Sequence, residues 1–223
     1  MTDFVIERYR AQDCAELGTM HFELLGDPAR NGYSLATVGP EFMAEAFYRL
    51  SLDNPHFHCD VARVDGRIAG FHVFTSQASS LTSFLVRHHP AGLLLAAIRS
   101  VLRRPRALLA LLRNLRYVGG EQLPFLAGVN GWWIVAGIPP QFRTREFEAT
   151  IGGSIAHMMM ARMEATFRRE GVDAWYVVVP PDNIPSTIFV QRCGARHEGT
   201  AFAQGKEMRY YIKRMPPTEA HAS

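Results

Sequence analysis

The segment GWWIVAGIPPQFR, residues 131–143, is followed shortly afterwards by IGGSIA, residues 151–156. In the first segment, Gly131–Ile138 is an apolar run of strand length that two prolines end. The second segment places two glycines directly before the helical pattern of Ile155–Glu170, which Gly171 ends. A strand, a turn and a helix in this order predict one unit of a mixed α/β sheet.

Regular patterns continue on both sides of this unit. The sequence predicts strands at Phe4–Arg8, His58–Val64, Arg67–Thr75, Ala174–Val179, Arg196–Phe202 and Glu207–Lys213. It predicts helices at Gln12–Leu25, Pro40–Leu50, Leu93–Leu102, Arg106–Arg116 and Pro185–Cys193. We therefore expect one α/β domain over residues 1–223, with a mixed central sheet flanked by helices. The Leu-rich segment 79–128 reads as a helical insertion between the third and fourth strands.

Composition limits the class of protein. The chain has 223 residues, of which 48% are hydrophobic and 20% charged, so it can bury a core and is not disordered. Cys14, Cys59 and Cys193 lack the spacing of a metal site, and the chain begins without an apolar leader. Its apolar runs are too short to cross a bilayer. We expect a cytoplasmic protein, or one peripheral to the inner face of the membrane.

Three motifs carry a resemblance to a known family. Pro140-Gln-Phe-Arg143 follows the fourth expected strand, IGGSIA opens the next helix, and Asn183 to Ala195 reads NIPSTIFVQRCGA. In order and spacing the chain resembles the GNAT superfamily of acyl-CoA N-acyltransferases, over about Phe4 to Met215 apart from the insertion. A helix N-terminus attracts phosphate, and glycines let a phosphate approach the backbone closely, so the match is physically reasonable.

The resemblance implies an N-acyltransferase, most simply an acetyltransferase, with acetyl-CoA or another acyl-CoA as co-substrate and no metal. It implies a small-molecule amine as acceptor. The residues that it assigns to the cofactor are Ala136, Gly137, Ile138, Ile151, Gly152, Gly153, Ser154, Ile155, Ala156 and Asn183. Of these, Ala136–Ile138 match the strand that holds pantetheine and offers an N–H to the thioester carbonyl, and Gly137 suits a strand that bulges or ends early.

Several positions depart from the family pattern. Val190 stands where a tyrosine often protonates the leaving thiolate, and Ile151 and Ser154 replace two usual residues of the pyrophosphate turn. No acid lies in Gly131–Ile138, where a general base is often found. His72 and His21 are weak candidates for the base, because the ordinary pKa of histidine suits proton transfer. Two rival interpretations stay open: a GNAT-like acyl-CoA-binding or scaffold module without catalysis, and a longer-chain acyltransferase that uses acyl-CoA or acyl carrier protein.

The charge of the chain is concentrated in one segment. Residues 81–120 contain seven arginines and no Asp or Glu, which leaves −4 for the rest of a chain whose formal net charge is +3. Three interpretations compete: helices packed on the domain or in a homodimer, a lid for an anionic ligand, and a peripheral contact with an anionic membrane. The segment is similar to insertions in GNAT-like proteins of bacterial surface-polysaccharide synthesis, which favours an amino sugar as acceptor. The near-neutral total charge argues against nucleic acid as a partner.

Overall fold

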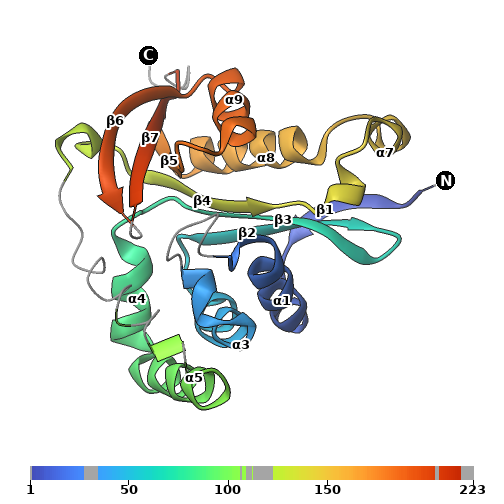
Figure 1. Ribbon diagram of the computed structural model, residues 1–223. Coiled ribbons are helices and arrows are strands. Elements are labelled where there is room, and N and C mark those ends of the chain that lie inside the picture. The colour runs from blue at the N-terminus through green and yellow to red at the C-terminus, as the bar shows by residue number, and fades with distance from the viewer. Residues whose placement is uncertain are drawn as a thin grey trace.

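The computed structural model describes residues 2–27, 35–105, 107–108, 112, 123–203 and 206–216. Within them, a seven-stranded sheet has the order β1-β2-β3-β4-β5-β7-β6 (Figure 1). The strands are β1 (Phe4–Arg8), β2 (Phe57–Val64), β3 (Arg67–Thr75), β4 (Gly131–Gly137), β5 (Ala174–Val179), β6 (Arg196–Ala203) and β7 (Lys206–Arg214). The pair β4–β5 is parallel and the other neighbouring pairs are antiparallel. The predicted mixed sheet is thus confirmed.

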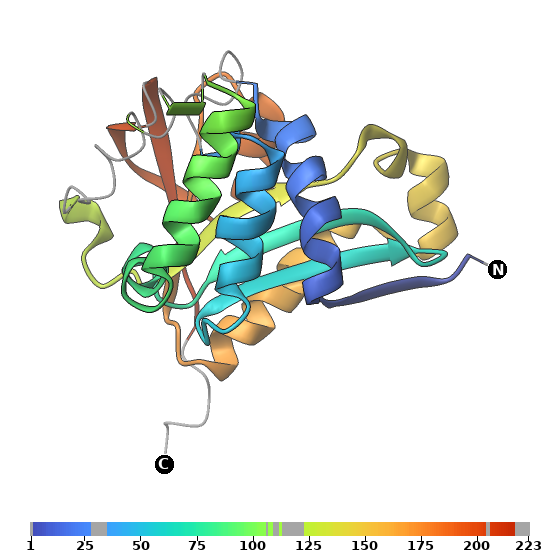
Figure 2. The ribbon, with the colours of Figure 1, turned by 90° about the horizontal axis from the view of Figure 1, so that it is seen from below.

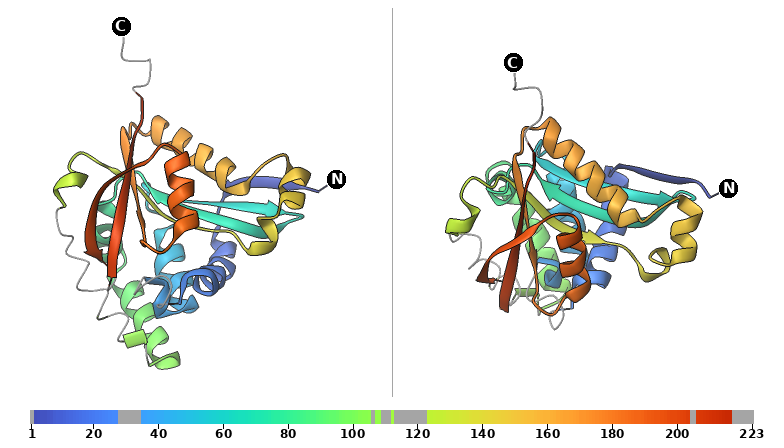
Figure 3. Two further views of the ribbon diagram at one scale, coloured as in Figure 1. Left: turned by 45° about the horizontal axis from the view of Figure 1, so that its top comes forward. Right: turned by 90° about the horizontal axis from the view of Figure 1, so that it is seen from above.

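Helices lie on both sides of the sheet. α8 (Ile155–Arg169) and α9 (Ile184–Arg192) cover one face, which Figure 3 shows from above. On the other side lie α1 (Cys14–Leu25), α3 (Pro40–Phe42) and α5 (Pro90–Arg103), side by side in Figure 2. The remaining helices are α4 (Ser80–His88) and α7 (Arg145–Ile151). Short 3₁₀ turns are η1 (Ala11–Asp13), η2 (Leu35–Val38), η4 (Arg49–Ser51), η5 (Pro124–Leu126) and η6 (Pro140–Phe142). Among the described residues, no helix combines the length and apolarity needed to span a bilayer.

Each face of the sheet has its own apolar core. Under α1 and α3 the buried side chains include Leu17, Met43, Phe47, Tyr48, Phe57 and Phe71. Under α8 and α9 they include Trp133, Met163, Phe167, Trp175, Val190 and Tyr211. Alternation along each strand sends successive side chains to opposite faces, so the two cores share one backbone layer.

The segment predicted as one helix, Pro40–Leu50, is helical but irregular. After α3 the chain forms a π-helix, η3 (Met43–Tyr48), and then η4. Five of the six residues of η3 are buried, with Glu45 the exception. A π turn holds more residues than an α turn, so the regular α-helical period predicted for Pro40–Leu50 does not continue through η3.

Between β3 and β4 the structure differs from the predicted helices in extent. The predicted helix Leu93–Leu102 lies within α5, which begins three residues earlier at Pro90. α4 precedes it and was not predicted, because only Leu81 and Leu85 of this helix are buried and two residues make a weak periodic signal. The predicted helix Arg106–Arg116 lies outside the described residues, except for 107, 108 and 112.

Close contact between α1 and the α3–η3 segment depends on Gly18. A Cβ at this position would lie 2.6 Å from the carbonyl oxygen of Pro40 and 2.7 Å from the backbone nitrogen of Ala44. Both atoms belong to the backbone, so neither can move without shifting η3.

We predict that Gly18→Ala destabilises the protein by about 1–3 kcal/mol, the usual cost of overpacking. The sign of this change in the free energy of unfolding is informative, because within a helix alanine is otherwise more stable than glycine by about 1 kcal/mol. Gly92→Ala in α5 is the matched control, since its Cβ would meet only the flexible Leu50 side chain at 3.2 Å. Urea unfolding of both variants measures the difference; equal stabilities would contradict the close approach.

Candidate functional site

The parallel strands β4 and β5 pair only over their first halves. Their register joins Gly131–Trp133 with Trp175–Val177 and then stops. β4 continues to Gly137 along β3, and β5 continues to Val179 along β7. Beyond Trp133, no strand in the described part of the chain pairs with this edge of β4, and its backbone groups there can bind a ligand.

A β-bulge marks the point where the strands separate. On β3, Val73 pairs with Val135 and Phe74 pairs with Trp133, so Ile134 is an extra residue in β4. A bulge bends its strand and interrupts the ladder locally. The sequence predicted a bulge or an early end at Gly137; β4 does end there, and the bulge lies three residues earlier.

The end of β4 is held from several directions. A Cβ at Gly137 would lie 2.4 Å from the Phe71 ring and 3.0 Å from Leu24 of α1, so this position requires glycine. After the 3₁₀ turn η6, the Nε of Arg143 donates a hydrogen bond to the carbonyl of Ile138 at 2.5 Å. This bond gives the Pro140–Arg143 motif a structural role, and it engages the carbonyl of Ile138, one of the residues predicted to hold the cofactor.

The glycine turn between α7 and α8 differs from the predicted phosphate loop. Gly152 ends α7 in the left-handed region, with φ 79° and ψ 18°. The N–H groups of Gly152 and Gly153 both donate to the carbonyl of Glu148. These two amides are therefore engaged within the protein, and the residues 144–151 that separate Arg143 from the turn form α7, which Thr144 caps.

The donors at the start of α8 are better placed to bind an anion. Ser154 is the N-cap, in extended conformation, and its side chain makes no capping hydrogen bond. The N–H groups of the first helical turn, including those of Ile155 and Ala156, have no partner inside the helix. Together with the helix dipole, they form a site suited to phosphate.

Asn183 has a defined structural role at the start of α9. Its side-chain oxygen accepts a hydrogen bond from the N–H of Ser186 at 3.2 Å, so Asn183 caps the helix. The predicted contact with the cofactor arm is left to the side-chain amide nitrogen.

Val190, at the position of the family tyrosine, points into the core and is 1% exposed. The preceding Phe189 is half-buried instead. Its ring lies 6.0 Å from the Trp133 ring and 5.0 Å from that of His157, an exposed residue of the first turn of α8. Neither Phe189 nor Val190 can donate a proton to a thiolate.

His72 lies opposite Ala136 on the neighbouring strand and is 1% exposed. Its ring packs against Trp133 and Phe74, with centroids 5.2 and 5.4 Å away, and neither nitrogen has a well-formed hydrogen bond in the described part of the chain. Burial lowers the pKa of His72 to about 3, against a weaker opposing contact with the backbone of Met159. The ring is thus neutral at pH 7 and a weak proton acceptor.

His21 of α1 lies in the core on the opposite face. Its Nδ1 is 2.9 Å from the hydroxyl of Tyr48, and burial lowers the pKa of His21 to about 3. Burial also raises the pKa of Tyr48 well above its ordinary value, so that hydroxyl stays protonated. His72 and His21 lie in separate cores and do not form one catalytic pair.

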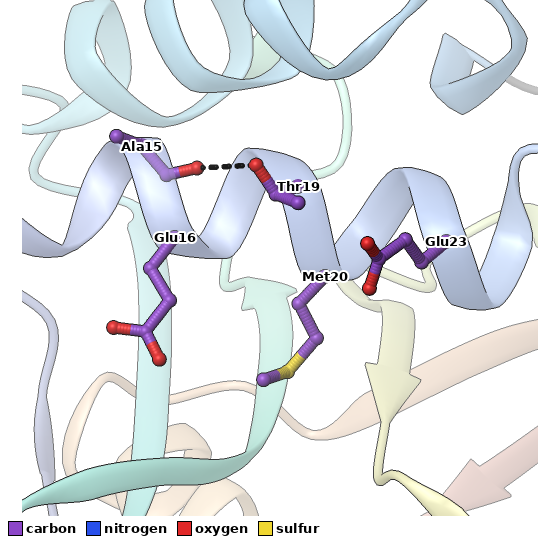
Figure 4. Close-up of a pocket in the computed structure, with 5 residues that line it drawn as sticks. All are labelled: Ala15, Glu16, Thr19, Met20 and Glu23. Atoms are coloured by element: carbon purple, nitrogen blue, oxygen red, sulfur yellow. Dashed lines mark hydrogen bonds between the residues drawn. The ribbon is translucent and has the colours of Figure 1, made fainter.

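Two shallow hollows lie on the α1 side of the sheet. One, about 470 Å³, follows an exposed side of α1 and is lined by Ala15, Glu16, Thr19, Met20 and Glu23 (Figure 4). A second, about 340 Å³, lies between α1, the α3–η3 segment and α5. Among the described residues, no three metal-ligating side chains gather at one point.

Comparison with solved structures identifies the fold. SsHAT is 16% identical, with a TM-score of 0.62 over 95% of this chain and 98% of that chain. Ard1 from Thermoplasma volcanium is 10% identical, with a TM-score of 0.55 over 96% and 99%. A protein assigned to the GNAT family of acetyltransferases, from Desulfovibrio desulfuricans, is 12% identical, with a TM-score of 0.54 over 95% and 99%. No protein-family model and no curated protein matches the sequence significantly. The chain therefore has the GNAT fold.

The buried histidines predict a pH dependence of stability. The pKa of His72 is lower in the folded state than the ordinary value of 6.5, so protonation favours unfolding, and stability falls as the pH drops from 7 towards 3. Between pH 7 and 5 we expect His72 to account for a loss of about 2 kcal/mol. His72→Phe, measured by urea unfolding at both pH values, should lose about that much less; an unchanged pH dependence would show that His72 is not buried as described.

Proposed function

We propose that this protein is an acyl-CoA-dependent N-acyltransferase that transfers an acetyl group to a primary amine of a small molecule. The observation that carries the proposal is the separation of β4 from β5 after Trp133 and Val177. In the GNAT fold, the pantetheine arm and thioester of acyl-CoA bind between the separated strands, and the phosphates of acyl-CoA bind at the start of the helix that corresponds to α8.

The phosphate end of the donor would bind at the first turn of α8. The amides of Ser154, Ile155 and Ala156 are the proposed donors, in place of those of Gly152 and Gly153, which bond to Glu148. Gly152 still contributes, because its left-handed backbone turns the chain and the space beside it is open. Ile151, the last residue of α7, packs in the core and orients this turn.

The acyl end would lie along the free edge of β4, beside Ala136 and Gly137. A backbone N–H there stabilises the negative charge that develops on the thioester oxygen when the amine attacks. The nitrogen forms a bond to the acyl carbon, the carbon–sulfur bond breaks, and coenzyme A leaves as the thiol. The bulge at Ile134 and the Arg143–Ile138 hydrogen bond hold this edge in place before the donor arrives.

Neither of the two buried histidines can readily take the proton from the amine. The amine has to be neutral to attack, and the pKa of about 3 makes both His72 and His21 poor acceptors. Val190 cannot protonate the thiolate. We infer that ordered water carries both protons, and that the rate rises with pH as the free amine becomes more abundant.

The acceptor would approach from the α1 side. Two features support a cationic amine carried on a ring, such as an amino sugar. Glu16 and Glu23 place two carboxylates along the hollow on α1. At the junction of β4 and β5, the half-buried rings of Trp132 and Tyr176 stack 5.7 Å apart and nearly parallel, which gives a flat apolar surface.

A second function, acyl-CoA binding without catalysis, is favoured by one observation. Val190, at the position of the family tyrosine, is sealed in the core and cannot protonate a thiolate. Both functions need the same donor site, so they are separated by turnover and not by binding.

The donor site is tested by Ser154→Asp. Aspartate is a good N-cap, so the melting temperature should be unchanged or higher. Its carboxylate would repel the phosphates, and the Kd for coenzyme A should rise by about tenfold or more, corresponding to about 1.4 kcal/mol. Thr144→Asp makes the matched change at the N-cap of α7 and should leave affinity nearly unaltered. A folded Ser154→Asp protein with wild-type affinity would remove the first turn of α8 from the proposal.

Catalysis is tested by incubating the protein with acetyl-CoA and a panel of primary amines, including amino sugars, and measuring thiol release. We expect release that depends on the amine and increases with pH. Micromolar binding of coenzyme A without turnover on any amine would overturn the enzyme and leave the binding module.

A further inference from the structure

Helix α5 is apolar on two opposite sides. Its inner side packs on the α3–η3 segment, in a small core that contains Val38, Phe42, Ala46 and Ala96. The buried hydroxyl of Ser100 donates a hydrogen bond to the carbonyl of Val38 at 3.0 Å. This side is held firmly by the domain.

The outer side of α5 consists of large aliphatic residues that face solvent. Leu94 is 62% exposed, Leu95 47%, Ile98 47% and Leu102 78%. Their spacing places them on one stripe of the helix, away from Ala96 and Ser100. We call these four residues the Leu stripe. Val86 of α4, Leu108 and Leu112 are also about half exposed.

Such a stripe is unusual on a surface open to water. A helix that is apolar on nearly every side is normally buried, and contiguous exposed apolar surface marks an interaction site. In Figure 1, α5 is the lowest element and lies away from β4, β5 and α8. A partner could therefore cover it without blocking the candidate site.

The charged side chains carried by α4 and α5 are positive, since neither helix contains an acidic residue. Arg87 and Arg99 are exposed, and no carboxylate in the described part of the chain pairs with either. Arg103 and Arg104 lie on the domain side, where Glu41 is 3.3 and 4.0 Å away. Arg99, between these residues and the stripe on the helix surface, also lines the groove that contains Glu41 and Glu45. The segment 81–120 contains no acidic residue at all.

The apolar stripe and the arginines together help to decide which of two partners covers α5: a second copy of the chain or an anionic lipid surface. If a second copy packed on the stripe about a two-fold axis, each surface would meet itself, and like charges would face each other with no acid from this segment to neutralise them. An anionic lipid surface satisfies both features, since aliphatic side chains enter the acyl boundary while arginines contact phosphates. We propose that α4 and α5 dock this protein on an anionic membrane through the Leu stripe, Arg87 and Arg99.

Vesicle co-sedimentation of the full chain tests this. We expect binding to vesicles of phosphatidylcholine mixed with phosphatidylglycerol that is at least about tenfold tighter than to phosphatidylcholine alone, and that weakens in high salt. Absence of binding to the mixed vesicles in low salt, or equal binding to both, would overturn the proposal.

Two variants with matched controls locate the surface. The double substitution Leu94→Gln and Leu102→Gln, and separately Arg99→Glu, should each weaken binding by about tenfold or more. Because these side chains face solvent, melting temperatures should not fall. The controls are Val5→Gln, at a 44% exposed residue of β1, and Arg67→Glu, at the β2–β3 hairpin, and both should bind as the wild type does. Variants that bind vesicles as tightly as their controls would refute the docking surface. A wild-type dimer that the double substitution dissociates would also refute it, because the stripe would then be covered by a second copy of the chain.

Discussion

The loss of pairing between β4 and β5 is the constraint on which the rest of the structure depends. Parallel strands normally bond along their full length, and each unpaired backbone group must find another partner or remain hydrated. Here the ladder stops after Trp133 and Val177, and the bulge at Ile134 bends β4 at the same point. Just after β4, Arg143 donates a hydrogen bond to the carbonyl of Ile138, while beyond Trp133 no described strand pairs with this edge of β4.

The free end of β4 is also the place where the two helical layers meet. On one side, the Phe71 ring and Leu24 of α1 leave no room for a side chain at Gly137. The position of α1 therefore limits where the end of β4 can lie. On the other side, His72 lies opposite Ala136 and contacts the backbone of Met159 in α8. A shift of either helix would move the edge that is proposed to hold the thioester.

Local patterns predicted the sheet because each strand and its turn carry their own signal. The prolines after Ile138 and the glycines at 152–153 were sufficient to locate the end of β4 and the start of α8. What could not be predicted depends on contacts distant in sequence. The position of the bulge reflects pairing with β3, and the engagement of the Gly152 and Gly153 amides depends on α7. The motif alone also does not tell which of the neighbouring residues Phe189 and Val190 faces the core. That depends on the rotation of α9 about its axis, which its tertiary contacts determine.

The basic segment shows why charge alone was a poor guide. Seven arginines were compatible with packing, a lid or a membrane, and the structure divides those that it describes into two groups. Arg103 and Arg104 lie near Glu41 and join α5 to the domain, which accounts for part of the charge as ordinary packing. Arg87 and Arg99 remain exposed beside aliphatic side chains that nothing described covers. Arginines without an apolar surface nearby would simply be solvated. An apolar surface without arginines would fit a second copy of the chain as well as a membrane. Their coincidence on α4 and α5 is what favours a lipid surface.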